Sequence, residues 1–452
     1  MTLTQAAEAV NGTLVGDDVS FAGVSTDTRT LAGRPLFVAL RGENFDGHDY
    51  LTKAAENGAV AALVERISDV AIPQLLVDDT RLGLGRLAAA WRRQSDTTVI
   101  AVTGSNGKTT LKEMIRSILL QQEKAVLATA GNLNNDIGLP LTLLRLQDEP
   151  RAVVEMGANH AGEIAYLSEI AQPDVAVLNN AGRAHLEGFG SPEGVARAKA
   201  EIISGLKEGG CFIYNADSPW AGLWRELAAN IKTIGFGSTA DADVHSTGAS
   251  GGMEWTESGF VNRFSVQTPV GEFEAELKLA GDHNLMNALA ASAVAVSIGV
   301  ELEDVKKGLA TLEPVKGRLH VIKVNDIYLV DDSYNANPDS VEAAMEGLRS
   351  GPGRHFLVLG DLAELGETAV ELHRSLGDKA RRMGIDYLYA MGELSAATVE
   401  GFGAAGRHFS NHESLLETLL KELEGECVVL IKGSRSAGME RIVEGIINKG
   451  GG

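Results

Sequence analysis

The sequence predicts an α/β protein of three domains, spanning residues 1–93, 94–313 and 314–452. The chain has 452 residues, and at about 100–200 residues per domain such a length predicts two to four domains. Short apolar runs of strand length alternate with longer segments of helical periodicity, a pattern typical of parallel sheets covered by helices. The segment EPVKGR at residues 313–318 has the composition of a hinge and separates two such series.

Charge and composition exclude several classes of protein. The formal net charge is −21, so the overall field does not attract nucleic acid or anionic lipid, and we expect neither as a partner. Cys211 and Cys427 are far apart in the chain, which is neither a disulfide framework nor a metal-cluster spacing. The start of the chain lacks the pattern of a signal peptide, and no apolar run approaches the roughly 20 residues of a membrane span. We expect a cytoplasmic enzyme, with a monomer as the working assumption.

The first domain combines short strands with two polar loops. Residues 36–40 and 59–64 read as strands, and residues 51–57 read as a helix. The polar stretches are STDTR at 25–29 and RGENFDGHD at 41–49, the second directly after a strand. Loops at the carboxyl ends of strands are where α/β sheets bind ligands. From chemistry alone, two ligand-binding loops and two ordinary surface turns are equally good interpretations.

The second domain begins with a strand, a glycine-rich bend and a helix. Residues 97–119 read TTVIAVTGSNGKTTLKEMIRSIL. Val99–Val102 is an apolar run that fits a buried parallel strand, and apolar residues recur at helical spacing after Lys108. This order points backbone N–H groups and a helix N-terminus at a phosphate. Lys108 adds a positive charge, and the Thr109 hydroxyl can hold Mg²⁺.

The glycine-rich bend is a shortened variant of the usual phosphate-binding loop. The usual pattern has a glycine five residues before the Gly-Lys pair, where this chain has Val102. The alternative interpretation is a solvated glycine turn with an exposed lysine. The preceding strand, the following helix and the doubled threonine favour a triphosphate site, and hence a P-loop-type ATP-binding domain with a parallel sheet.

The remaining segments of the second domain continue the strand–helix alternation. Strands are expected at residues 152–156, 175–178 and 211–214. Residues 260–266 and 273–279 alternate in polarity across Pro-Val-Gly, which predicts a hairpin and a small antiparallel appendix. Helices are expected over 284–298 and 305–312.

The third domain is expected to be Rossmann-like. Strands are predicted at residues 327–330, 355–359, 387–390 and 428–431, with helices between them. The turn after the first of these strands lacks the Gly-x-Gly-x-x-Gly fingerprint that dinucleotide-binding sheets carry at that position.

Three side chains of the second domain are candidates for chemistry. Glu155 ends an apolar strand beside the phosphate loop, where a carboxylate suits Mg²⁺; the alternative is a surface acid. His185 follows the next strand and can converge on the same crevice, although a lone histidine is more often structural. Lys199 lies on a predicted helix, where a lysine is normally on a solvated face, and its spacing says nothing more.

Nine motifs together resemble the Mur ligase family of cell-wall synthesis, nearly end to end and in the family's order. They are GSNGKTT, VVEMGANHAGEI, NNAGRAHLEGFGS, ARAKAEI, LAGDHNLMNALAA, KGRLH, DDSYNANPDS, LGDLAELGE and IKGSRSAGME. Two further stretches, GENFDGHDY and TAGNLNNDIGLP, resemble the member that adds D-alanyl-D-alanine to UDP-N-acetylmuramoyl-tripeptide. The Asp-Asn-Pro-Arg motif of the sister enzyme that adds the third amino acid does not occur.

The resemblance implies a role for each matching residue. It implies ATP binding by Gly104, Ser105, Asn106, Gly107, Lys108, Thr109, Thr110, His283, Asn284, Asn287, Arg318, Asp332 and Asn335. It implies substrate binding by Asp27, Thr28, Arg29, Asp46, Gly47, His48, Asn132, Asn134, Asn135, Ser434 and Arg435. It implies two Mg²⁺ ions held by Thr109, Glu155, His185 and a CO₂ adduct (carbamate) of Lys199, and a catalytic set of Lys108, Glu155, His185, Lys199 and Arg318.

The activity implied by the resemblance is ATP-dependent amide ligation through an acyl phosphate, in peptidoglycan precursor synthesis. The substrates would be UDP-N-acetylmuramoyl-tripeptide, D-Ala-D-Ala and ATP. Two other functions stay open. A folylpolyglutamate-type synthetase shares the phosphate loop and the modified lysine. A P-loop motor or switch acting on nucleic acid or protein is the second, although the acidic balance counts against nucleic acid.

Overall fold

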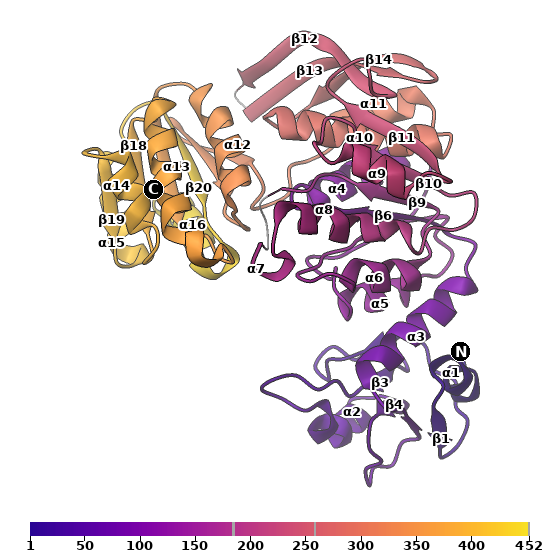
Figure 1. Ribbon diagram of the computed structural model, residues 1–452. Coiled ribbons are helices and arrows are strands. Elements are labelled where there is room, and N and C mark those ends of the chain that lie inside the picture. Colours follow the sequence, from indigo (N-terminus) through magenta and orange to yellow (C-terminus); the bar gives the residue numbers. More distant parts are fainter. Residues whose placement is uncertain (183–185, 257–258, 451–452) are drawn as a thin grey trace.

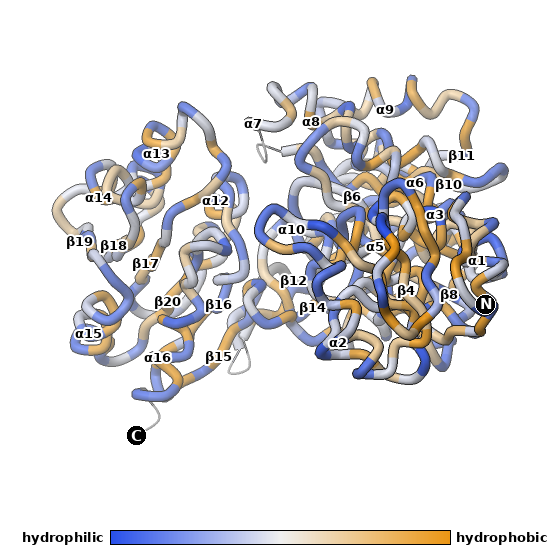
Figure 2. Tube along the Cα trace, turned by 90° about the horizontal axis from the view of Figure 1, so that it is seen from below, coloured by the Kyte–Doolittle hydropathy of each residue, from blue (hydrophilic) through white to orange (hydrophobic). Residues whose placement is uncertain are grey.

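The computed structural model describes residues 1–182, 186–256 and 259–450, and these residues form three α/β units, each built around its own sheet (Figure 1). The α/β fold class with mainly parallel sheets is therefore confirmed. Figure 2 shows the third domain as a separate body beside the overlapping N-terminal and central parts. Every helix within the described ranges is too short or too polar to cross a membrane.

The N-terminal sheet has the strand order β1-β5-β4-β3-β2, parallel except for the β1–β5 pair. Its strands are β1 (Thr13–Val15), β2 (Val24–Ser25), β3 (Leu36–Val38), β4 (Ala61–Val64) and β5 (Gln74–Leu76). Its helices are α1 (Leu3–Val10), η1 (Gly47–Tyr50), α2 (Leu51–Glu56) and α3 (Thr80–Arg93).

Helix α3 connects the N-terminal sheet to the central domain. Its buried Arg92 donates from Nη2 to Asp174 Oδ2 at 3.0 Å and from Nε to the Ala171 carbonyl at 2.9 Å, both in the central domain. Gly85 packs against the Tyr166 ring so closely that a Cβ there would lie 2.2 Å from the Tyr166 hydroxyl. The helix thus contacts both domains, and the domain boundary at residue 93 stays a prediction.

The central sheet has nine strands in the order β14-β13-β12-β11-β10-β9-β6-β8-β7. The strands are β6 (Thr98–Thr103), β7 (Val126–Ala128), β8 (Arg151–Glu155), β9 (Val175–Leu178), β10 (Cys211–Asn215), β11 (Lys232–Gly237), β12 (Val244–Thr256), β13 (Gly259–Thr268) and β14 (Gly271–Leu277). The helices are α4 (Lys108–Leu119), α5 (Gly138–Leu143), α6 (Glu163–Ala171), α7 (Leu186–Phe189), α8 (Pro192–Ala200), η2 (Glu201–Ile203), α9 (Ala221–Leu227), α10 (Asp282–Ser297) and α11 (Leu302–Ala310).

The predicted hairpin is confirmed as β13 and β14, which pair antiparallel. It is not a detached appendix, because the long strand β12 joins it to the parallel part of the same sheet through β11. The sequence did not predict β12, whose glycine-rich stretch GASGG interrupts any strand pattern.

Residues 99–102 of the central strand β6 are all apolar because both faces of the strand are buried. Ile100 and Val102 pack into the core under α4 and α10, while Val99 and Ala101 pack into the core under α5 and α6. A parallel strand covered on both faces must be apolar at every position. The run then places the loop at residues 104–107 at its carboxyl end.

The third sheet has the order β15-β16-β20-β17-β18-β19, parallel except for β15–β16. Its strands are β15 (His320–Val324), β16 (Ile327–Asp332), β17 (Arg354–Gly360), β18 (Tyr387–Met391), β19 (Gly406–Phe409) and β20 (Cys427–Lys432). Its helices are α12 (Pro338–Arg349), η3 (Gly366–Thr368), α13 (Ala369–Arg382), α14 (Ala396–Phe402), α15 (His412–Glu422), η4 (Arg435–Ala437) and α16 (Glu440–Gly450).

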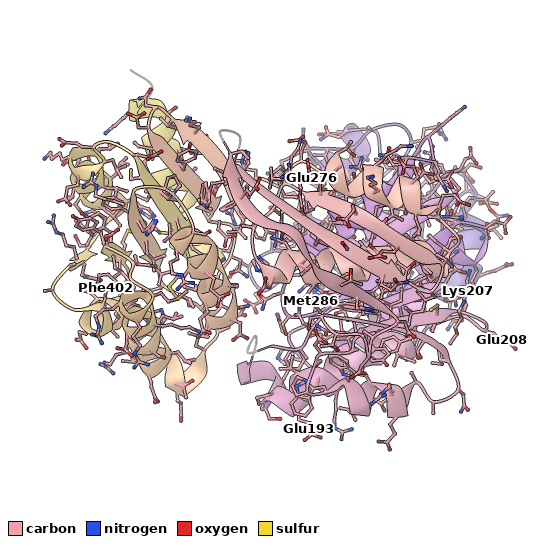
Figure 3. All side chains as sticks on the ribbon, turned by 90° about the horizontal axis from the view of Figure 1, so that it is seen from above. Glu193, Lys207, Glu208, Glu276, Met286 and Phe402 are labelled. Carbon is pink, nitrogen blue, oxygen red and sulfur yellow. The ribbon has the colours of Figure 1, made fainter. Side chains whose placement is uncertain are left out.

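Besides the linker, the third domain contacts the central domain at the β12–β13 hairpin and at the phosphate loop. The end of the β12–β13 hairpin reaches the third domain (Figure 3), where the Trp255 ring packs edge-on against Tyr328 with centroids 5.4 Å apart. At the phosphate loop, Asn337 Nδ2 donates to Asn106 Oδ1 at 2.6 Å. The central and third domains are therefore in direct contact.

Candidate active site

A cavity of about 1180 Å³ lies between the central and third domains. Most of the predicted nucleotide-site residues line it, together with part of the predicted substrate set: Ser105, Asn106, Gly107, Lys108, Thr109, Thr110, Asn132, Asn134, Asn135, Glu155, His283, Asn284, Asn287, Arg318, Asp332, Asn335, Ser434 and Arg435. The structure thus brings together segments up to 330 positions apart, as far as Ser105 is from Arg435 (435 − 105).

The phosphate loop has the conformation that its glycines allow. Gly107, the residue before α4, has φ +78°, and a Cβ there would lie 2.7 Å from Asn287 Oδ1, so both the backbone and the space require glycine. Lys108 begins α4 and donates from Nζ to the Gly104 carbonyl at 2.6 Å. Burial lowers the pKa of Lys108 to about 8, with Glu155 opposing that shift and Arg318 adding to it.

An asparagine network that the sequence analysis did not assign holds the phosphate loop against α10. The buried Asn179 donates from Nδ2 to Asn287 Oδ1 at 2.7 Å and to the Asn106 carbonyl at 3.2 Å. Asn180 Oδ1 accepts from the Asn106 N–H at 2.9 Å, and Asn287 Nδ2 donates to Asn284 Oδ1 at 3.2 Å. The adjacent Asn-Asn pair directly after a strand was the available signal for this network.

Glu155 has the surroundings expected of a ligand for a hard cation. Its side chain is 1% exposed, and its Oε1 has no hydrogen-bond partner among the described residues. Buried polar atoms in proteins are normally paired, so a carboxylate oxygen left open at a cavity wall fits Mg²⁺. Thr109 is buried and lines the same cavity.

The second Mg²⁺ was predicted at His185 and a carbamate of Lys199. His185 lies outside the described residues. Within residues 1–182, 186–256 and 259–450, no three or more His, Cys, Asp or Glu side chains form a group able to hold a metal ion. The predicted ligand set consists instead of the Thr109 hydroxyl, the Glu155 carboxylate, the His185 imidazole and a modified Lys199.

Lys199 is buried, unlike the solvated lysine that its helix position suggested. Its side chain is 1% exposed, and its Nζ lies 3.4 Å from the Ala158 carbonyl and 5.2 Å from the Phe189 ring centre. Burial, with help from the charge of Lys108, lowers the pKa of Lys199 to about 7. A neutral amine is the form that reacts with CO₂, so the residue fits a carbamate. It lies behind the cavity wall formed by Ala158.

The third domain contributes a buried ion pair to the cavity. Lys432 Nζ donates to Asp332 Oδ2 at 2.6 Å and to the Asn335 carbonyl at 3.0 Å. Burial raises the pKa of Asp332 and Lys432 opposes this, while burial and then Lys432 lower the pKa of His283 to about 4. Lys432 was not predicted from the sequence, and it contacts Asp332 only because β16 and β20 are neighbours.

An aromatic ring supports the two arginines of the third-domain wall. The guanidinium of Arg318 lies 4.4 Å from the Tyr334 ring centre and that of Arg435 lies 5.8 Å from it. Such cation–π contacts hold guanidinium groups in place. Ser434, next to Arg435, shares a hydrogen bond with the Ser436 hydroxyl at 3.1 Å. Tyr334 was also not assigned from the sequence.

The loop with Asn132, Asn134 and Asn135 is fixed against the strand that carries Glu155. The Gly157 N–H donates to the Asn134 carbonyl at 2.8 Å, and Asn135 Oδ1 accepts from the Gly138 N–H at 2.9 Å at the start of α5. Asn132 is exposed and its carbonyl accepts from the Asn134 N–H at 2.7 Å.

The predicted residues of the N-terminal domain lie away from this cavity, in two separate polar loops. Asp27 pairs with Arg29 at 2.7 Å, and this hydrogen bond lowers the pKa of Asp27 to about 2. The Thr28 carbonyl accepts from Asn57 Nδ2 at 2.7 Å.

The second N-terminal loop is centred on Asp46. Burial opposes its ionisation, but hydrogen bonds from the His48 N–H and from Arg66 hold the pKa of Asp46 well below its ordinary value. His48 pairs through Nδ1 with Asp46 at 2.7 Å and accepts through Nε2 from the Glu65 N–H at 2.9 Å. Gly47 fits under the loop, where a Cβ would lie 2.7 Å from the Leu40 carbonyl. His48 therefore uses both ring nitrogens within the protein.

Family descriptions match the chain in three successive parts. "Mur ligase family, catalytic domain" matches residues 20–92, "Mur ligase middle domain" matches 102–295, and "Mur ligase, glutamate ligase domain" matches 317–435. The chain is 46% identical to the UDP-N-acetylmuramoyl-tripeptide–D-alanyl-D-alanine ligase of Escherichia coli (strain K12), over 100% of this chain and 99% of that protein. It is 38% identical to the ligase of the same name from Bacillus subtilis (strain 168), over 99% and 98%.

Solved structures agree with these sequence matches. A crystal structure of MurF from Acinetobacter baumannii superposes with a TM-score of 0.91 at 37% identity, covering 99% of this chain and 98% of that one. MurF from Thermotoga maritima in complex with ADP gives 0.85 at 31% identity, covering 95% and 97%. A folylpolyglutamate synthase from Mycobacterium tuberculosis, at 16% identity and a TM-score of 0.64, shares the fold alone. By sequence and by structure, this chain belongs to the Mur ligase family.

Proposed function

We propose that this chain is an ATP-dependent amide ligase that joins D-Ala-D-Ala to UDP-N-acetylmuramoyl-tripeptide in peptidoglycan precursor synthesis. One observation carries the proposal. A single cavity gathers the phosphate loop, the buried Glu155 and Arg318 of the third domain, in a chain 46% identical from end to end to a ligase of that name.

The proposed reaction has two steps. The terminal carboxylate of the tripeptide attacks the γ-phosphorus of ATP, and the bond to the β-phosphate oxygen breaks to give an acyl phosphate and ADP. The free amine of D-Ala-D-Ala then attacks the acyl carbon, loses a proton, and expels phosphate. Phosphoryl transfer depends on positioning and charge stabilisation more than on covalent help, and the acyl phosphate must be kept from water.

The phosphate loop and the third domain would bind the nucleotide between them. The backbone of residues 104–107, Lys108 and Thr110 would hold the phosphates at the N-terminus of α4. Arg318 would reach the γ-phosphate from the other side. His283, Asn284 and Asn287 on α10 would meet the adenine, and Asp332 and Asn335 would meet the ribose.

Two Mg²⁺ ions would supply the positive charge that lets a carboxylate approach a triphosphate. The Oε1 of Glu155, which has no hydrogen-bond partner among the described residues, and the Thr109 hydroxyl would hold one ion. His185 and a carbamate on Lys199 would hold the second. The lowered pKa of Lys199, about 7, supports the carbamate because much of the amine is then uncharged near neutral pH.

The N-terminal domain would bind the uridine nucleotide through its two polar loops. Asp27, Thr28 and Arg29 form one loop, and Asp46, Gly47 and His48 form the other. Because both His48 nitrogens are engaged within the protein, we assign this residue to holding Asp46 in place. Asn132, Asn134 and Asn135 would meet the peptide, and Ser434 with Arg435 would meet D-Ala-D-Ala.

We also propose that the enzyme acts in the cytoplasm as a monomer. ATP and a UDP-linked sugar are nucleotides of that compartment, and one chain supplies the described walls of the cavity. We propose residues 1–93, 94–313 and 314–452 as its three domains, because a separate sheet lies within each range.

Product mass spectrometry with phosphate release tests the function. The enzyme is incubated with ATP, D-Ala-D-Ala and the nucleotide-sugar tripeptide carrying either lysine or meso-diaminopimelate. We expect the pentapeptide mass and one phosphate per product. Lys108→Ala and Glu155→Ala should lose both signals with unchanged circular dichroism, whereas Lys124→Ala, an exposed lysine, should retain them. Phosphate release driven by glutamate or by a polynucleotide, with no pentapeptide, would favour the two alternative functions.

A further inference from the structure

We propose that Lys112 is a positioning residue for Glu155, and that it prepares this carboxylate to bind a divalent cation. The inference rests on the proposed function only in taking Glu155 as a metal ligand. Lys112 lies on α4, the helix that follows the phosphate loop. Its contacts within the described part of the chain point to this role.

Lys112 is a buried cation one helical turn after Lys108. Its side chain is 3% exposed, which is rare for lysine unless it is paired. Its Nζ donates to the Thr129 carbonyl at 2.8 Å and lies 2.8 Å from Glu113 Oε1 and 3.6 Å from Glu155 Oε1. The ammonium group is therefore surrounded by oxygen atoms, two of them on carboxylates.

Thr129 ties Lys112 and Glu155 together. Its carbonyl accepts from Lys112 Nζ, and its hydroxyl accepts from the Glu155 backbone N–H at 2.9 Å. One residue thereby contacts both the lysine head group and the backbone of Glu155. Because Thr129 joins α4 to the strand that carries Glu155, the ammonium group of Lys112 and the carboxylate of Glu155 are held close together.

The 3.6 Å separation matters for the chemistry. At this distance Lys112 offsets the buried charge of Glu155 without a hydrogen bond, and Oε1 has no hydrogen-bond partner among the described residues. A lysine in hydrogen-bond contact would occupy the lone pair that a metal needs. Glu155 lines the cavity, whereas Lys112 does not. One side of the carboxylate is therefore open to a ligand, and the other side faces the ammonium group.

The same helix offers a matched control. Arg116 lies one turn further along α4, is 43% exposed, and pairs with Glu113 at 3.5 Å. Arg116→Met also removes a cation of α4 that pairs with Glu113, but it leaves the contacts of Glu155 unchanged. Lys112→Met and Arg116→Met therefore differ in their effect on Glu155.

The first test measures metal binding rather than turnover. ADP binding is followed by calorimetry at a series of fixed Mg²⁺ concentrations, for the wild type, Lys112→Met and Arg116→Met. We expect Lys112→Met to need about tenfold more Mg²⁺ to tighten ADP binding, with the metal-free ADP affinity unchanged; this factor is the lower end of what removing an outer-shell partner of a metal ligand costs. Arg116→Met should match the wild type. An unchanged Mg²⁺ dependence in Lys112→Met would overturn the proposal.

The second test separates this role from a merely structural one. Urea unfolding is measured for Lys112→Met, Glu155→Gln and the double variant. If Lys112 serves Glu155, its replacement lowers the unfolding midpoint less in the Glu155→Gln background, because no unpaired charge is left buried. Equal shifts in both backgrounds would overturn the proposal. If Lys112→Met does not fold, recovery of a folded double variant supports the proposal and its failure to fold contradicts it. This cycle needs no ligase activity, so its outcome is independent of the assigned substrates.

Discussion

Replacing Lys199 with methionine should stabilise the protein, and most strongly at low pH. The lysine is 1% exposed, and burial lowers its pKa from 10.5 to about 7. Each tenfold change in proton affinity corresponds to about 1.4 kcal/mol. Below pH 7 the folded protein therefore bears a penalty of about 5 kcal/mol for keeping Lys199 charged. Methionine has a similar length and no charge, so it removes the penalty without opening a cavity.

The sign of the pH dependence follows from proton binding. Between pH 7 and 10.5 the unfolded chain holds a proton on Lys199 that the folded chain has released. Stability of the wild type therefore rises with pH across this window, and the penalty fades. At pH 9 about 2 kcal/mol of it should remain. The advantage of Lys199→Met should thus shrink by about 3 kcal/mol between pH 6 and pH 9.

Urea unfolding in CO₂-free buffer at pH 6 and pH 9 measures this difference. Tryptophan fluorescence reports on the central domain, because Trp224 lies in its core and Trp91 and Trp220 pack against that core. Arg197→Met is the control, since Arg197 lies on the same helix with a 57% exposed side chain; its effect should be small at both pH values. A constant difference between Lys199→Met and the wild type at pH 6 and pH 9 would refute a lowered lysine pKa.

Three further outcomes follow from the geometry. In buffer with ¹³C-bicarbonate, the wild type should show a carbamate signal in ¹³C NMR spectra that Lys199→Met lacks. Gly107→Ala should weaken ADP binding at least tenfold in calorimetry, because the new Cβ meets Asn287 Oδ1 at 2.7 Å and φ is +78°; unchanged affinity would contradict the close approach. Trp255→Ala should lower the thermal midpoint of the third domain, since the ring packs on Tyr328; an unchanged midpoint would show that the hairpin contact is not stabilising.

The sequence predicted local structure best where one stretch contains all the information. The strand, loop and helix around Lys108 are adjacent in the chain, and β6 and α4 begin within one residue of the expected positions. The edge strands β15 and β19 were missed because their residues are mostly half-exposed and mix polar with apolar types. Such strands are held by pairing with a neighbour, which periodicity does not reveal.

The site residues that were missed depend on long-range contacts. Lys432 is 100 residues from Asp332 and reaches it because their strands pair in the third sheet. The burial of Lys199 depends on Phe189 and Ala158, which come from different segments. Lys112 has ordinary helical spacing, and only its packing onto Thr129 separates it from a solvated lysine. Residue type alone cannot distinguish these lysines from exposed ones, because burial is a property of the assembled sheets.

The distribution of cations explains how an acidic chain can hold several anions. The net charge is −21, yet Lys108 lines the cavity from the central domain, and Arg318, Lys432 and Arg435 line it from the third. Neither domain alone carries the full set. Because the anions must be matched by cations from both sides, a ligand that contacts both walls also stabilises the domain arrangement. The Asn337–Asn106 hydrogen bond at 2.6 Å joins the third domain directly to the phosphate loop, so the position of that domain and the occupancy of the loop are physically linked.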